Sequence, residues 1–234
     1  MKKYAVTFFL VSFFSCTVYP QVSNGEIGLL QKLDSIRNSP SVSRHFAGLY
    51  FNTSSKAINF FLHKPEKERM FIQKLETSFA DYFFRSANAF AEGTTVPEEW
   101  KAYFKDTSLT PLQYQLLGIN AHINGDIWQA LVSAFSLEEI QNGKKSYFEF
   151  NRELINQYKE FYNWSVSENA RIKLLHTATA GFDKLYGEKM LKRWRKRQIK
   201  LAILYYSDNK KFQNQISKLR QKMEHINRLI LRNL

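Results

Sequence analysis

The chain of 234 residues has one cysteine, nine glycines and five prolines. With one cysteine it forms no internal disulfide, and once Cys16 is cleaved off or modified, no thiolate remains for catalysis or metal binding. So few glycines and prolines argue against a turn-rich β fold and favour helices. Beyond the N-terminal region, no stretch approaches the ~18 uninterrupted apolar residues that a membrane-spanning helix needs. These absences leave a helical domain without disulfides.

The first residues have the pattern of an export signal. Two lysines precede an uncharged apolar run over residues 5–14, which is too short to span a bilayer. We therefore predict a signal peptide over residues 1–21 and an exported protein that is periplasmic, secreted or lipid-anchored to the envelope. Ser15 before Cys16 fits a lipoprotein signal, whereas Phe13 stands where an aliphatic residue is usual. Lipidation of Cys16 and ordinary cleavage a few residues later both stay open.

The net charge of +13 is concentrated at the C-terminal end. Fifteen of the 34 lysines and arginines, but only three of the 21 acidic residues, lie in residues 184–234. The densest cluster is a candidate contact for an anionic membrane surface. It consists of Lys192, Arg193, Arg195, Lys196, Arg197 and Lys200. The alternative is a solvated helix face that keeps the protein in solution. The predicted export argues against a nucleic-acid partner.

Apolar residues recur at helical spacing after residue 21, and no run alternates with a period of two. Helix starts are predicted at Thr95, Thr110 and Ser136, where the sequence has the form of a capping box or carries proline in the first turn. The most apolar helix is predicted over residues 111–135. We therefore predict an all-α fold, a single-domain bundle of seven or eight helices over residues 22–234, with that helix buried at its centre.

The last helix has apolar residues at alternating spacings of four and three. They form a heptad seam that consists of Phe212, Ile216, Leu219, Met223, Ile226 and Ile230. The seam is shorter than the ~3–4 repeats that indicate an independent coiled coil. It therefore packs most simply on the rest of the bundle, and pairing with a second copy as a homo-oligomer is the alternative.

The predicted central helix has a polar stripe without lysine, arginine or glutamate. At 100° per residue its members fall close to one line. They are Gln115, Gly118, His122, Asp126, Gln129 and Ser133. A stripe that faces water normally holds long charged side chains, so we interpret this one as an internal polar seam or the wall of a pocket. Gln115, Gly118 and Gln129 are the candidate ligand-binding residues in it.

His122 and Asp126 are four residues apart, so both side chains leave the same face of a helix one turn apart. This spacing suits chelation of a divalent metal such as zinc, a general base in which Asp126 orients His122, or a buried structural pair. His176 and Asp81 are the candidate third partners of such a site. The three roles stay open.

Asn120 and Asn124 lie on the opposite side of the same helix. Their apolar neighbours predict that both amides are buried. Buried amides usually cross-link neighbouring helices, so we predict a structural role for both residues.

The segment LLGINAHINGD, residues 116–126, resembles the signature LLGxNAHIxxD of an uncharacterised family, a domain of unknown function. The resemblance extends to Phe79-Ala80-Asp81-Tyr82, to Pro97 with Trp100, to Phe104, and to Phe148 with Asn151, and it would cover most of residues 45–205. It implies an all-α fold and singles out His122 and Asp126. It implies no reaction.

Residues 122–132 are also similar to the HxxGDIHQPLH segment of the helical zinc-dependent nuclease and phospholipase C group. In that group the first histidine, the aspartate and the last histidine bind zinc. This sequence has Trp128 and Val132 at the two later histidine positions, and Ala180 stands four residues after His176 where the later HxxxD motif of the group has its aspartate. The resemblance therefore implies a shared scaffold with a degenerate or single-metal site.

Two functions stay open from the sequence. In the first, the protein is a non-catalytic ligand- or envelope-binding protein, and His122 and Asp126 belong to its internal structure. In the second, it is a metal-assisted, hydrolase-like enzyme that acts on an ester or phosphoester through the same two residues. The sequence does not name a substrate.

Overall fold

The computed structural model describes residues 22–233, and the regular elements in this range are helices. The predicted signal peptide and Cys16 lie outside the described residues. The elements are α1 (Asn24–Arg37), α2 (Arg44–Leu62), α3 (Glu66–Ala91), η1 (Glu98–Trp100), α4 (Lys101–Phe104), α5 (Pro111–Asn120), η2 (Ala121–Asp126), α6 (Ile127–Ala134), α7 (Leu137–Asn142), α8 (Lys144–Glu168), α9 (Ala170–Ala178), α10 (Phe182–Ser207) and α11 (Asn209–Asn233).

The predicted all-α class is confirmed, but the predicted number of helices is wrong. When α5, η2 and α6 are counted as one continuous rod and η1 is counted together with α4, residues 22–233 contain ten helices rather than seven or eight. Short helices such as α4, α7 and α9 raise the number, because each is ended by a turn after one to three helical turns. None of the helices in the described range is long and apolar enough to cross a membrane.

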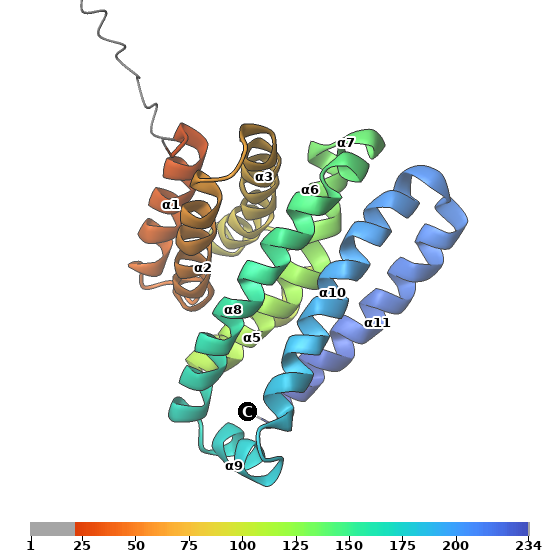
Figure 1. Cartoon of the computed structure of the whole chain (residues 1–234). Coiled ribbons are helices and arrows are strands. Elements are labelled where there is room, and N and C mark those ends of the chain that lie inside the picture. Colours follow the sequence, from red (N-terminus) through yellow and green to blue (C-terminus); the bar gives the residue numbers. More distant parts are fainter. Residues whose placement is uncertain (1–21, 234) are drawn as a thin grey trace, which may run out of the picture.

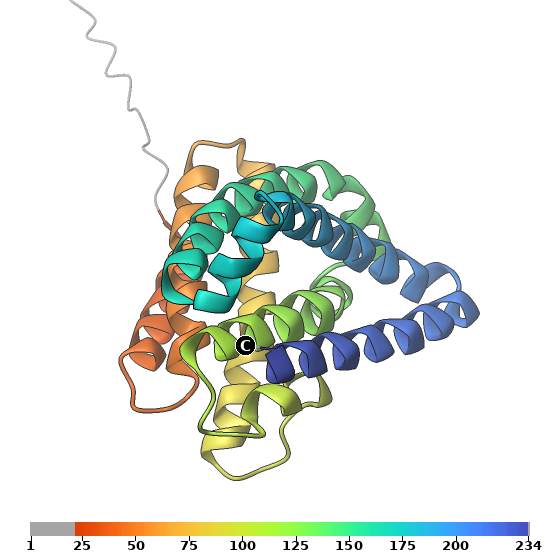
Figure 2. The ribbon, with the colours of Figure 1, turned by 90° about the horizontal axis from the view of Figure 1, so that it is seen from below.

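The helices are arranged in three groups (Figure 1). The rod lies in the middle, with α1, α2 and α3 on one side and the antiparallel pair α10 and α11 on the other, and α8 packs against α2, α3 and α10. Helix α9 lies at one end of the molecule, near the C-terminus, and α7 lies at the other end. Figure 2 views the same arrangement from the α9 end. The rod thus meets helices from both flanking groups.

The predicted central helix is not one regular α-helix. Its middle part, η2, is π-helical over Ala121–Asp126. A π turn closes i→i+5 hydrogen bonds and holds one residue more than an α turn, so the residues after it are rotated relative to the regular helical wheel. The helical wheel at 100° per residue, on which the polar stripe was predicted, therefore does not apply across the whole rod.

Two of the three predicted helix starts are confirmed. The Thr110 hydroxyl accepts from the backbone N–H of Gln113, and the Gln113 side chain accepts from the backbone N–H of Thr110. Ser136 and Glu139 form the same reciprocal pair. The start at Thr95 is wrong, because η1 has Pro97 as its N-cap and no side-chain cap. The fixed φ of proline suits the start of a helix, and its ring has no oxygen that could cap the following N–H groups.

The largest core lies between α1–α3 and the rod. Leu33, Leu75, Phe83, Trp100 and Leu131 are among its residues, and each is at most 1% exposed. A second cluster joins α10, α11 and Trp128. Five of the six residues of the heptad seam are buried inside the chain, so the seam packs on the bundle. Pairing through the seam would require α11 to leave α10.

Candidate functional site

His122 and Asp126 lie in η2, and their side chains are in direct contact. The Nδ1 of His122 is 2.9 Å from Oδ2 of Asp126, and Trp100 of η1 donates from Nε1 to the same oxygen at 3.0 Å. Both members of the pair are at most 3% exposed. The four-residue spacing therefore brings the two groups together away from solvent.

Aromatic rings enclose the imidazole of His122. The ring of Phe79 from α3 stacks on it with the centroids 3.4 Å apart. The rings of Tyr50 and Phe46 from α2 meet it at steep angles, at 4.6 and 5.3 Å. Since Asp126 occupies Nδ1, the atom that remains for chemistry or recognition is Nε2.

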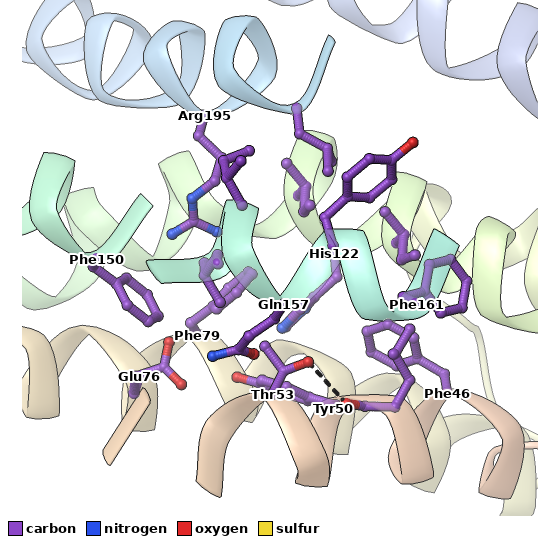
Figure 3. A pocket seen from close by; sticks show the side chains of 17 residues that line it. Phe46, Tyr50, Thr53, Glu76, Phe79, His122, Phe150, Gln157, Phe161 and Arg195 are labelled. Carbon is purple, nitrogen blue, oxygen red and sulfur yellow. Dashed lines mark hydrogen bonds between the residues drawn. The ribbon is translucent and has the colours of Figure 1, made fainter. Parts of the chain in front are cut away.

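A cavity of about 120 Å³ lies beside His122, between α2, α3, α8, α10 and the rod (Figure 3). Most of its wall is apolar. Among the described residues, three that line the cavity have a buried side-chain atom without a hydrogen-bond partner: Nε2 of His122, the hydroxyl of Tyr50 and Oε1 of Gln157. Buried polar atoms are nearly always hydrogen-bonded, so three such atoms at one cavity point to a ligand with polar groups.

Arg195 from α10 and Glu76 from α3 also line this cavity, and their side chains converge on it in Figure 3. Each is 3% exposed. Arg195 donates from Nε to Asn151, and its guanidinium lies 5.0 Å from the centre of the Phe150 ring. Within the described range no carboxylate lies close enough to Arg195 for an ion pair. The guanidinium is thus a buried cation whose charge is only partly balanced.

Burial changes the ionisation of the groups around the cavity. It raises the pKa of Glu76 to about 7, although the charge of Arg195 and a 3.1 Å hydrogen bond from Ser54 oppose the shift. It also raises the pKa of Tyr50 well above its ordinary value, so the phenol keeps its proton. Near neutral pH the cavity therefore has a permanent cation at Arg195 and a carboxyl group at Glu76 that exchanges a proton.

Burial also governs the His122–Asp126 pair. It raises the pKa of Asp126 well above its usual range, against the hydrogen bond from Trp100, and it lowers the pKa of His122 well below its usual range, with the charge of Arg195 adding to the effect. Both shifts favour the uncharged forms. In that state Asp126 donates its proton to Nδ1, so the imidazole proton is on Nε2 and the cavity meets an N–H donor.

The contact between Nδ1 of His122 and the carboxylate of Asp126 leaves Nε2 as the imidazole nitrogen that is open to a metal ion. In the part of the chain that the structure describes, no group of three or more His, Cys, Asp or Glu side chains is placed to hold a metal.

The comparison with protein families covers nearly the whole described chain. A family model described as "Family of unknown function (DUF5995)" matches residues 28–233. The chain belongs to this family. The match is longer than the residues 45–205 of the motif resemblance. The searches of curated proteins and of solved structures gave no match. The DUF5995 assignment therefore brings no activity with it, and the cavity has to be interpreted from its own geometry.

The other predicted pocket residues of this DUF5995 chain lie away from the cavity. Phe46 fills the space above Gly118, where a Cβ would lie 2.3 Å from the phenylalanine ring. Gln129 donates to the backbone oxygen of Gly125 at 2.9 Å, and Gln115 lines a separate surface depression between α2 and α8. The space that Gly118 leaves in the polar stripe is thus filled by the side chain of Phe46 from α2.

Asn120 and Asn124 belong to a chain of buried amides. Asn120 donates to the backbone oxygen of Met223 at 3.0 Å and to the side chain of Asn227 at 2.8 Å, both in α11. Asn124 donates to Asn120 at 2.9 Å. Gln198 of α10 donates to Asn124 at 3.4 Å. The amides thus connect the rod with α10 and α11.

The structure corrects three placements expected from the sequence. His176 lies in α9, where it contacts Tyr162 and Asp183, and it does not approach His122. Asp81 is on the surface of α3. Arg195 is not part of the basic surface of α10, because it is buried beside Trp194 and faces the cavity.

Tyr50, Glu76 and Arg195 line the cavity, but the sequence did not place them at a ligand site. Glu76 had a signal, since it follows Leu75 and precedes Phe79 on the apolar face of α3, where a carboxylate has no place unless it is paired. Arg195 stands among five other cations, and their pattern does not show which of them is buried.

Proposed function

We propose that this protein binds a small, mainly apolar carboxylic acid in the cavity beside His122, without converting it. The observation that supports this is the set of donors on one small apolar space: the Arg195 guanidinium, the Tyr50 hydroxyl and, in the uncharged pair, Nε2–H of His122. Binding pockets typically combine apolar walls with a few convergent polar groups. An ionised carboxylate accepts several such bonds and balances the buried cation.

The volume limits the ligand. A cavity of ~150 Å³ in another protein takes up benzene, so about 120 Å³ suits a short aliphatic acid or an acid with a single ring. The apolar body of such a ligand would lie against Phe46, Phe79 and Phe150, and the carboxylate would lie toward Arg195.

Calorimetric titration of the full chain tests this proposal. We expect pentanoate or benzoate to bind at least about tenfold more tightly than pentanol or benzyl alcohol, because a charge-assisted hydrogen bond contributes ~1.5–3 kcal/mol. Tyr50→Phe should weaken binding of the acids about fivefold or more. The control Tyr206→Phe, whose hydroxyl bonds to Val132 and Phe135 on another face, should bind like the wild type. Equal affinity for acids and alcohols, or no binding of the acids at millimolar concentration, would contradict the proposal.

A second candidate function is hydrolysis of an ester or phosphoester. One observation favours it: the contact between Asp126 and Nδ1 holds Nε2 of His122 toward the cavity, as in a general base oriented by a carboxylate. The similarity of residues 122–132 to the zinc-dependent nuclease and phospholipase C group supports it as well. For this role Asp126 has to be ionised, so that Nε2 has a free lone pair.

The tautomer of His122 separates the two candidates. Nitrogen-15 NMR should find the proton on Nε2 if the site is a donor for an acid, and on Nδ1 if the site is a base. Turnover of p-nitrophenyl acetate or p-nitrophenyl phosphate, assayed with zinc and with chelator, that is lost in His122→Gln would establish the hydrolase.

The predicted export is part of the same proposal: residues 1–21 direct the chain out of the cytoplasm, and the ligand is then a molecule of the envelope or the surroundings. Amino-terminal sequencing of protein recovered from the envelope and the medium tests this, and lipid labelling at Cys16 separates a lipoprotein from ordinary cleavage. A full-length chain that is found only in the cytoplasm would contradict it.

A further inference from the structure

The α9 end of the molecule exposes large apolar side chains. Leu174, Leu175, Phe182, Leu185 and Tyr186 are between 51% and 70% exposed, although they lie within thirteen consecutive residues. Four of them, all but Leu174, line one open groove formed with α8. Contiguous exposed apolar surface of this kind marks an interaction site on a folded protein. We call these five residues the α9 patch.

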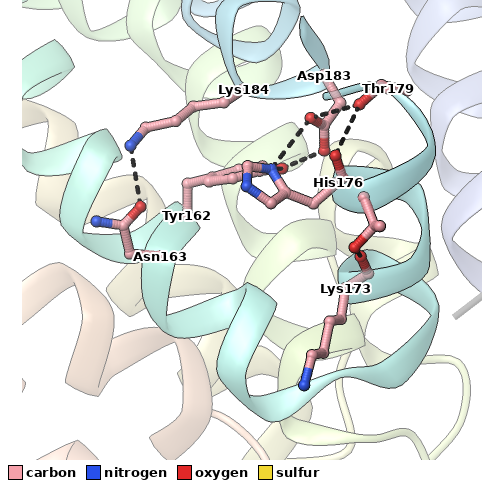
Figure 4. Close-up of polar contacts among 8 residues, drawn as sticks. Tyr162, Asn163, Lys173, His176, Thr179, Asp183 and Lys184 are labelled. Atoms are coloured by element: carbon pink, nitrogen blue, oxygen red, sulfur yellow. Dashed lines mark hydrogen bonds and ion pairs between the residues drawn. The ribbon is translucent and has the colours of Figure 1, made fainter. Parts of the chain in front are cut away.

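The polarity of α9 is the reverse of that of an ordinary surface helix. No residue of α9 is buried. His176 and Thr179 turn inward: His176 Nδ1 is 2.9 Å from the Tyr162 hydroxyl, and Thr179 donates to Asp183 at 2.9 Å (Figure 4). The Tyr162 hydroxyl also donates to Asp183. These bonds tie α9 to α8 and α10 by its polar side, so its leucines are held toward solvent.

The segment that carries the α9 patch is rich in cations. Residues 169–193 contain six lysines and arginines and two acidic residues. Of these two acids, Asp183 is engaged by Tyr162 and Thr179, and Glu188 lies 3.9 Å from Lys192. Lys173 and Lys189 are exposed, and Lys189 lines the same groove as the apolar residues. The surface thus combines exposed apolar side chains with a positive rim.

We propose that the α9 patch docks on the surface of a membrane that contains anionic phospholipids. Apolar side chains that enter the boundary between headgroups and acyl chains, with lysines at headgroup level, are the chemistry of an interfacial anchor. The position of α9 at one end of the molecule lets a flat bilayer reach it without meeting the other helix groups (Figure 1). Helix α10 runs away from this end (Figure 1), so of its exposed cations Lys192 and Arg193 lie nearer to the α9 patch than Lys196 and Lys200. This inference does not depend on the ligand of the cavity.

Co-sedimentation of the full chain with vesicles tests the docking. The wild type should bind vesicles of phosphatidylglycerol and phosphatidylcholine, bind pure phosphatidylcholine more weakly, and lose most of the difference in 1 M salt, because charge attraction is screened there. The triple variant Leu174→Ser, Phe182→Ser and Tyr186→Ser should reduce partitioning at least about tenfold on both lipids. Lys173→Glu with Lys189→Glu should reduce it at least about tenfold on the anionic vesicles at low salt only.

A matched variant controls for a general loss of apolar surface. Met70→Ser with Ile27→Ser removes two exposed apolar side chains from α3 and α1 and should bind vesicles like the wild type. Circular dichroism establishes that each variant is folded, and Phe182→Ser alone replaces the triple variant if that one unfolds. The proposal is overturned if the wild type stays in the supernatant, if all variants bind equally, or if the triple variant instead converts a dimer into a monomer in light scattering.

Discussion

Glu76 is a buried carboxyl group on an apolar helix face, and its ionisation affects the stability of the fold. Its pKa is about 7 in the folded protein against an ordinary value of 4.5, so the folded state holds this proton more tightly than the unfolded state. The stabilisation that Glu76 contributes to the folded state is therefore complete below about pH 4.5 and is lost as the pH rises through about 7.

Glu76→Gln should remove this loss. Above pH 8 we expect the variant to be more stable than the wild type by about 3 kcal/mol, which corresponds to the difference between the two pKa values. Urea unfolding at pH 5 and pH 8.5 measures the effect, and Glu98→Gln on the exposed start of η1 is the matched control. Wild type and Glu76→Gln with the same pH dependence would show that Glu76 ionises normally.

Tyr50 and Tyr103 are two buried tyrosines that differ in their hydrogen bonds. The hydroxyl of Tyr103 donates to the backbone oxygen of Val42 at 2.8 Å, whereas that of Tyr50 has no partner among the described residues. Tyr103→Phe should lower the free energy of unfolding by about 1 kcal/mol, and Tyr50→Phe should raise it by about 1 kcal/mol, because it removes a hydroxyl that is desolvated without compensation.

Thermal and urea unfolding of both variants without ligand check the prediction. A higher stability of Tyr50→Phe together with weaker binding of acids would mean that the hydroxyl is kept for recognition. If Tyr50→Phe loses as much stability as Tyr103→Phe, the hydroxyl of Tyr50 has a partner in the folded protein and is not free for a ligand.

At the residue scale, sequence reasoning selected His122 and Asp126 because their spacing and the missing charges around them are local properties. The positions of Tyr50, Glu76 and Arg195 depend on how α2, α3 and α10 pack against the rod, which local pattern does not contain. Arg195 is one of six neighbouring cations in the sequence, and the packing of α10 against α6 and α8 decides which of them is buried.

At the scale of elements, the rod is where the regular helical pattern fails. The capping residues Thr110 and Ser136 mark its two ends in the sequence. The π segment between them has no comparable signal, because a π turn depends on tertiary contacts around Ala121–Asp126 rather than on terminal side chains. π segments often occur at functional sites, and in this protein the π segment contains His122 and Asp126.

Gly118 of α5 shows how closely α2 packs on the rod. A Cβ at this position would lie 2.3 Å from the ring of Phe46, and Phe46 is also a wall of the cavity. Gly118→Ala should therefore lower the free energy of unfolding by about 1–3 kcal/mol through overpacking. It should also weaken ligand binding, because Phe46 has to move.

Gly28→Ala in α1 is the control for Gly118→Ala. A Cβ at Gly28 would have no atom within 4 Å, so alanine should stabilise this helix by roughly 0.5–1 kcal/mol. Urea unfolding of both variants gives the comparison. A Gly118→Ala variant that gains stability like Gly28→Ala would mean that Phe46 moves away at no cost.

At the scale of the whole molecule, the class of fold followed from composition and periodicity, but the arrangement of the helices did not. Only long-range packing shows that the α11 seam covers α10 and the rod, or that α9 presents its leucines outward. The predicted single domain over residues 22–234 makes a specific claim about cooperativity. The α10–α11 cluster and the main core are separate apolar clusters, and α10 and α11 join the main core through Ile199, Ala202 and Ile230 and through the amides of Asn120 and Asn124.

Leu219→Ala tests whether these clusters unfold together. Leu219 is 2% exposed in the α10–α11 cluster, and Leu33 is fully buried in the main core. Each change to alanine should cost about 2–5 kcal/mol. If the chain is one cooperative unit, both variants shift a single urea transition in which circular dichroism and tryptophan fluorescence coincide. If α10 and α11 unfold separately, Leu219→Ala alone splits the transition, and the amide chain through Asn120 then does not couple α11 to the rod.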